Sequence, residues 1–184
     1  MSTQTTPADI LDFWFAAEHR RLWFDSTPEF DARIRERFLA LWHRGRAGEL
    51  DPWAKDPKGA LALVILLDQW PLNMFRDDPL AYSTEAQARG IAAAAIAAGF
   101  DQGLEGAERS FLYLPFMHSE AAADQERSVA LFTAAGLEDG RRWALHHQEI
   151  IRRFGRFPHR NALLGRPSTP EELAYLASPG AFHG

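Results

Sequence analysis

Apolar residues along this chain recur mostly at steps of three and four, the spacing that places side chains on one face of an α-helix. No stretch alternates apolar and polar residues with the Val, Ile and Thr enrichment of strands, so the pattern predicts an all-α protein. Threonine or aspartate repeatedly precedes proline, and this pair suits the N-cap and first residue of a helix. The expected helices are 7–16, 28–45, 57–70, 79–98, 107–117, 119–135, 139–154 and 170–177.

The length and the linkers favour one domain. A chain of 184 residues is long enough to form a single core, and the connections between the expected helices are short. Residues 59–67 are apolar on every side, which indicates a helix surrounded by other helices. We therefore expect residues 1–184 to form a single-domain array of about eight antiparallel helices.

Charge is distributed unevenly along the chain. The formal net charge is −5, which argues against non-specific nucleic-acid binding, yet residues 141–166 contain seven arginines and one acid, Glu149. A basic stretch inside an acidic protein indicates either internal charge pairing or an anion site. The absence of cysteine excludes disulfides, zinc–thiolate sites and thiol nucleophiles. No apolar run could span a bilayer and the first ten residues lack leader-peptide features, so we expect a cytoplasmic protein.

Helical spacing carries several polar residues onto apolar faces. His118 and Gln125 share a stripe with Ala121, Ala122, Val129 and Phe132, and His147 shares one with Trp143, Ile150, Ile151 and Phe154. Asp68 continues the apolar face of the central helix, where a carboxylate needs a cation or other donors to stay ionised. Each has an alternative interpretation: a hydrogen-bonded core histidine, or a structural ion-pair partner.

The segment "FGRFPHRNALLGR" (residues 154–166) follows the expected helix stop at Gly155 and holds Arg156, His159, Arg160 and Asn161. Arginine forks suit carboxylates and phosphates bidentately. Two roles are open for this cluster. It binds an anionic ligand, or it fastens the C-terminal segment to Asp68, Glu85 or Glu120.

Four sequence blocks resemble a bacterial family known as domain of unknown function 924. They are "LDFWF" (11–15), "LLDQWPLNMFR" (66–76), "FLYLPFMHSE" (111–120) and "FGRFPHRNALLGRPSTPEEL" (154–173), in the same order and with similar spacing. The resemblance implies an all-helical fold similar to tetratricopeptide-repeat domains, and it implies no reaction. The family block after the central helix usually reads Pro-Arg-Asn, whereas here it is Pro71-Leu72-Asn73, so any anion contact by that arginine is absent here.

The known catalytic motifs are missing. There is no HExxH or ExxH metal pair, His118 and Glu120 diverge if both lie on one helix, and neither a G-x-S-x-G elbow nor a Gly-rich phosphate loop occurs. We therefore expect no metal and no cofactor. The partner would be a small anionic molecule or a peptide carboxylate.

Binding, metal-free acid–base catalysis and peptide recognition remain open, with His118, Glu120 and His159 as the catalytic candidates. The full set of expected ligand-binding residues is Asp68, Arg76, His118, Glu120, His147, Arg156, His159, Arg160 and Asn161.

Overall fold

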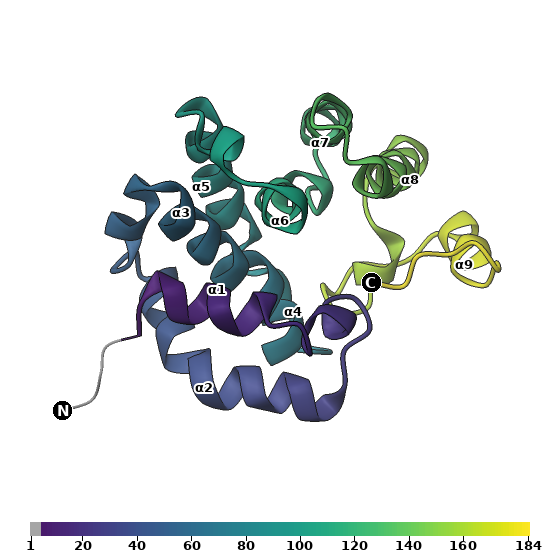
Figure 1. The fold of residues 1–184 in the computed structure, drawn as a ribbon. Coiled ribbons are helices and arrows are strands. Elements are labelled where there is room, and N and C mark those ends of the chain that lie inside the picture. The colour runs from purple at the N-terminus through teal and green to yellow at the C-terminus, as the bar shows by residue number, and fades with distance from the viewer. Residues whose placement is uncertain (1–4) are drawn as a thin grey trace. The chain divides into compact units, whose positions relative to one another are not determined.

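The computed structural model describes residues 5–184, and its secondary structure there is helical throughout, with no strand (Figure 1). The all-α prediction is thus confirmed, whereas the likeness to tetratricopeptide repeats stays a prediction. The prediction that the first ten residues lack leader-peptide features falls partly on residues 1–4, which lie outside the described residues. No helix of the described part is long and apolar enough to cross a membrane.

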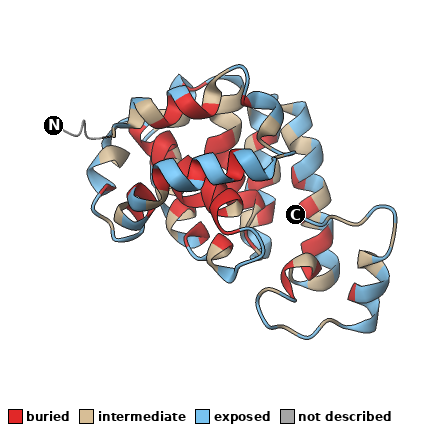
Figure 2. Ribbon diagram, turned by 90° about the horizontal axis from the view of Figure 1, so that it is seen from below, coloured by how far each residue is buried: buried red, intermediate tan, exposed pale blue. Residues whose placement is uncertain are grey.

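Contacts along the backbone divide the chain into two compact units. The first comprises residues 1–76 and 80–115, and the second comprises residues 77–79 and 116–184. The expectation of a single domain stays a prediction. In Figure 2 the buried residues concentrate on the inward sides of the helices, and the outer faces are exposed.

The first unit is built around α3 (Pro57–Val64), which packs against α1 (Pro7–Phe15) and α5 (Glu85–Ala97). Helix α2 (Pro28–Arg46) packs against α4 (Trp70–Met74). Residues 60–67 are completely buried, which confirms the expectation of a surrounded helix. Gly59 is required at the start of α3, because a Cβ atom there would lie 2.0 Å from the carbonyl oxygen of Trp53.

Four of the N-caps are at a threonine or aspartate that precedes a proline, as the sequence predicted. The side chains of Thr6, Thr27, Asp56 and Thr169 each accept a backbone N–H of the following first turn, and Thr6 and Thr169 form complete capping boxes. Some ends differ from the expected ones. Helix α2 runs past Gly45 to Arg46, and α6 covers Gly106–Met117.

The central helix does not stop at Trp70, as expected, but continues through Pro71. Residues Ile65–Gln69 form a π-helical turn, in which the N–H of Trp70 donates to the carbonyl of Ile65. Pro71 has no N–H and so cannot donate to the preceding turn of the helix. The hydroxyl of Thr84 donates to the Leu67 carbonyl in that turn, with an Oγ1–O distance of 2.6 Å.

The same contact explains why the expected helix 79–98 is broken. Pro79–Tyr82 form only a 3₁₀ turn, and α5 begins at Glu85. Thr84 lies between them with a non-helical backbone (φ −114°, ψ 2°), while its side chain reaches Leu67 and accepts the Trp42 indole N–H at 3.4 Å. Tertiary hydrogen bonding therefore overrides the helical pattern at this residue.

The second unit contains the antiparallel pair α7 (Ala122–Ala134) and α8 (Glu138–Phe154), followed by α9 (Pro170–Leu176). Gly140 allows the two helices to approach closely, because a Cβ atom there would lie 2.3 Å from the Phe132 ring. Helix α7 begins at 122 and not at 119, because Ser119 donates to Asp124 and Gln125 binds the carbonyls of Met117 and Ser119. On its stripe Gln125 and Phe132 are buried as expected, whereas Ala121 and Ala122 are exposed.

We predict that Thr84→Val lowers the free energy of unfolding by about 1–3 kcal/mol, because the Leu67 carbonyl would lose its donor in a fully buried place. Chemical denaturation at neutral pH measures the change. Thr84→Ser keeps the hydroxyl and is the matched control. Equal stability of the valine and serine variants would contradict the assigned role of this hydrogen bond.

Candidate functional site

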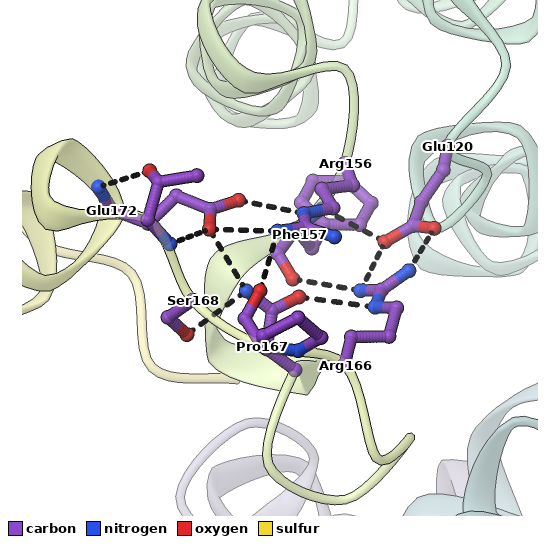
Figure 3. A network of polar contacts seen from close by, with 9 residues as sticks. Glu120, Arg156, Phe157, Arg166, Pro167, Ser168 and Glu172 are labelled. Atoms are coloured by element: carbon purple, nitrogen blue, oxygen red, sulfur yellow. Dashed lines mark hydrogen bonds and ion pairs between the residues drawn. The ribbon is translucent and has the colours of Figure 1, made fainter.

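The arginine-rich segment is held by carboxylates of its own unit. Arg156 donates from Nε and Nη2 to the two carboxylate oxygens of Glu172, at 2.7 and 2.8 Å (Figure 3). Its Nη2 also donates to the carbonyl of Pro167 at 2.9 Å. Glu172 is only 2% exposed, and it is the capping-box acid of Thr169 as well. One carboxylate therefore both caps α9 and fixes Arg156.

Arg166 forms the second pair of this network, with Glu120. Its Nη1 and Nη2 lie 2.7 and 2.9 Å from the Glu120 carboxylate oxygens, and its Nε donates to Asn161 at 3.0 Å (Figure 3). The amide of Asn161 donates in turn to Glu172 and Ser168. The backbone N–H of Phe157 also donates to Glu120.

These bonds keep both acids ionised. Burial raises the pKa of Glu120, but the hydrogen bonds from Arg166 and Phe157 outweigh it and bring the pKa below its ordinary value. For Glu172 the hydrogen bond from Arg156 is the largest influence and lowers the pKa to about 2, against the opposing effect of burial. Glu120 is thus an ion-pair partner in this structure, and its geometry does not suit a general acid.

The contacts do not support the expected clamp for an external anion. Arg156 and Asn161 already bind Glu172, and Arg160 is buried with its guanidinium 4.9 Å above the Phe157 ring. Arg166 is paired with Glu120, one of the three acids considered for fastening the C-terminal segment. Glu172, the partner of Arg156, was not among those three.

The histidines on apolar faces occupy different environments. His147 is buried, its Nδ1 is 2.9 Å from the Trp143 carbonyl oxygen, and burial lowers its pKa to about 3. Burial, helped by the nearby Arg160, also lowers the pKa of His159 to about 3. His118 is half-buried. Within residues 5–184 no three histidine or acidic side chains converge so as to hold a metal ion.

Asp68 and Arg76 belong to the first unit. Asp68 is completely buried, where the sequence predicted partial burial, and accepts from Gln69 Nε2 at 2.5 Å. Arg76 donates from Nε to Asp31 at 2.7 Å. Asp31, which the sequence analysis did not single out, also accepts from Ser26 and from Asn73, both at 2.7 Å.

Asp31 lies in a pocket of about 290 Å³ between α2 and α4. Two arginines line it, Arg76 and Arg35, and Arg35 donates from Nη1 to the Met74 carbonyl at 2.5 Å. Leu72 does not line this pocket, so an arginine at that position is not part of its wall. The complete lining is Pro28, Asp31, Ala32, Arg35, Asn73, Met74 and Arg76.

A larger pocket of about 660 Å³ follows one side of α1. Lys58 is the cation on its wall, and Lys58 is paired with Glu108 at 2.5 Å. Asp12 adds a second acid to the lining. The excess charge of this pocket is negative, so it is less suited to an anion than the pocket of Arg35 and Arg76.

Comparison with known proteins extends the sequence resemblance. Residues 10–180 match the model of a family described as "Bacterial protein of unknown function (DUF924)". A solved structure of a protein of unknown function from Agrobacterium tumefaciens is similar, with a TM-score of 0.87 and 42% identity over 93% of this chain and 96% of that one. Among curated proteins no match was found.

We predict that Glu172→Gln removes stability at neutral pH but not in strong acid. The pKa of Glu172 is lowered when the protein is folded, so its contribution is present above the ordinary value of 4.5 and is lost as pH falls toward about 2. Denaturant unfolding of both proteins across this range should show the difference in free energy of unfolding shrinking as pH falls. Glu171→Gln, an exposed neighbour on the same turn, is the control. A difference independent of pH would contradict the assigned ion pair.

Proposed function

We propose that this chain, which belongs to the DUF924 family of bacterial proteins of unknown function, binds a small anion in the pocket between α2 and α4. The supporting observation is that two guanidinium groups and one carboxylate line this pocket. The expectation of an anionic ligand is retained, but the site moves from Arg156 and Asn161 to Arg35 and Arg76.

The charges of the wall support an anion. Burial raises the pKa of Asp31, but the hydrogen bonds from Arg76, Ser26 and Asn73 outweigh it, and the pKa is lower than usual. Asp31 is therefore ionised at neutral pH and offsets one of the two positive charges. Arg35 binds a neutral carbonyl, that of Met74, so its charge is not offset by that contact. The lining keeps a net charge of about +1, which attracts an anion.

The geometry of the wall supports orientation as well as attraction. The contacts of Asp31 with Asn73 and Arg76 brace α4 against α2, so part of the pocket wall is fixed before a ligand arrives. Arg35 uses Nη1 for Met74, and its planar head has further N–H groups with which to meet a carboxylate or a phosphate. A preorganised wall lowers the entropic cost of binding.

Size and lining indicate the class of ligand. A pocket of about 290 Å³ is at the small end of the range for ligand sites, about 300–1,000 Å³. Pro28, Ala32 and Met74 supply apolar contacts beside the two arginines. A small carboxylate or phosphate ester with a short apolar part fits this combination better than a long peptide.

Binding is favoured over acid–base catalysis by the same residues. No histidine lines the pocket, and Asp31 is held as a carboxylate by Arg76, so it is poorly suited to exchange protons near neutral pH. His118 and His159, the expected proton carriers, are not among the lining residues. The alternative of a metal-free enzyme would therefore need its proton donor to come from the ligand.

We predict that small carboxylates and inorganic phosphate raise the melting temperature of the wild-type protein and that Arg35→Ala weakens this effect. At a concentration of about 100 Kd the ligand stabilises by about 2.7 kcal/mol, and loss of the arginine fork should raise Kd at least about tenfold. A thermal-shift titration at constant ionic strength measures both, with each protein compared with its own ligand-free form.

Arg33→Ala is the matched control, because Arg33 is also an exposed arginine of α2, its guanidinium lies over the Phe13 ring, and it does not line the pocket. Arg35→Lys keeps the charge without the planar fork and should fall between the two. An unchanged titration in Arg35→Ala, or a wild type that responds to no anion, would overturn the proposal.

A further inference from the structure

In the second unit, the side chain of Phe182 is surrounded by aromatic rings. Its ring centroid lies 4.5 Å from that of His147 and 5.0 Å from that of His159, and both rings stand edge-on to it. His146 and Trp143 complete the surroundings, at 6.3 and 6.4 Å. Edge-to-face pairs at these distances are favourable beyond the area they bury. We call these four residues, Trp143, His146, His147 and His159, the aromatic cradle.

The cradle is built on well-fixed elements. Three of its members lie on α8, and His147 is anchored by its contact with the Trp143 carbonyl at 2.9 Å. His159 lies in the short 3₁₀ turn Pro158–Arg160, and its ring is 5.7 Å from the buried Phe157. Beneath the cradle Ile150, Ile151 and Phe157 form a buried apolar cluster, on which Phe182 packs. The cradle therefore does not depend on Phe182 for its backbone.

Phe182 itself is held by much less. Residues 181–184 adopt no helix, and two backbone hydrogen bonds hold this segment: the N–H of Phe182 donates to the Tyr175 hydroxyl at 2.9 Å, and that of Ala181 donates to the Ser178 carbonyl at 3.1 Å. Trp143 is 48% exposed at the rim of the cradle. The Phe182 ring thus occupies the cradle, while the short segment that carries it is held by few hydrogen bonds.

The cradle selects for an uncharged ring. Burial keeps His147 and His159 neutral by lowering the pKa of each to about 3, and the neighbouring Arg160 acts in the same direction. His118, His146 and His183 are the other basic groups that face the pair, and Glu120 is the acid that opposes them at His159. Neutral imidazoles present aromatic edges without a full charge, so they suit a phenyl ring better than an ion.

We propose that the aromatic cradle is a binding site for an uncharged aromatic side chain of a peptide segment, and that Phe182 fills it as an internal, displaceable ligand. The residues are those of the second unit alone, and the site is independent of the anion pocket. Because Phe182 is tethered, its effective concentration at the cradle is on the order of millimolar or higher. A peptide in solution therefore competes poorly until Phe182 is removed.

The test uses the full chain with Phe182→Ala and an acetylated peptide of the sequence Ser-Pro-Gly-Ala-Phe-His-Gly, which copies residues 178–184. In the variant the pKa values of His147 and His159, followed by NMR of the imidazole protons, should rise from about 3 toward the ordinary 6.5. Adding the peptide should shift the same resonances and lower both pKa values again. The wild type should bind the peptide at least tenfold more weakly than the variant.

Two controls separate ring recognition from tail structure. The peptide with alanine in place of phenylalanine should not bind, and the protein variant His183→Ala, which changes the same segment but keeps the ring, should bind the peptide as weakly as the wild type does. Phe182→Leu keeps apolar contact and provides a second host if the alanine variant unfolds. Equal peptide binding by wild type and variants, or no binding by a folded Phe182→Ala protein, would overturn the proposal.

Discussion

A carboxylate that loses its water must collect other donors, and this constraint arranges the polar centres of the structure. Glu172 is 2% exposed and accepts from Arg156, Asn161 and the backbone of Thr169. Asp31 accepts from Ser26, Asn73 and Arg76. In each case one acid joins segments that are distant in the sequence, and removing the acid would take one partner from each of the cations and amides that it binds. The buried acids therefore need these ion pairs whether or not a ligand is bound. A ligand must be bound by other groups, whose charge no carboxylate offsets.

The local part of the fold was predictable because it depends on neighbours in the sequence. The caps at Thr6, Thr27, Asp56 and Thr169 follow from a threonine or aspartate before a proline, and each was found. The same pair at Asp78 and Pro79 is followed only by a 3₁₀ turn. The complete burial of residues 60–67 follows from a run that is apolar on all sides. What failed was set by tertiary contacts. Thr84 interrupts the expected helix 79–98 because its hydroxyl donates a hydrogen bond to the carbonyl of Leu67, seventeen residues earlier. No local sequence pattern predicts that hydrogen bond.

The polar residues show the same division. The segment 154–166 was identified as unusual, and Glu120, which lies 46 residues before Arg166, was among the partners considered for it. Glu172, which binds Arg156, was not among them. Arg35 was overlooked because it is one of several exposed arginines of α2, such as Arg33 and Arg37, and looks like surface charge. Only the packing of α4 against α2 distinguishes it, by placing the Met74 carbonyl and the Arg76–Asp31 pair at its side. Periodicity assigns a residue to a face, but it does not tell which groups of another helix meet that face.

The proposed position of the anion depends on whether a carboxylate already offsets the charge of the guanidinium that would bind it. At Arg156 an incoming anion would have to displace Glu172, a carboxylate tied to the first turn of α9 by its own cap. Such an exchange replaces one bidentate contact with another and breaks the capping box, so it yields little net free energy. Arg35 donates instead to a carbonyl, that of Met74, and a hydrogen bond to a neutral group leaves the positive charge in place. An anion there adds an interaction without removing one, and that asymmetry, rather than the number of arginines, favours the pocket between α2 and α4.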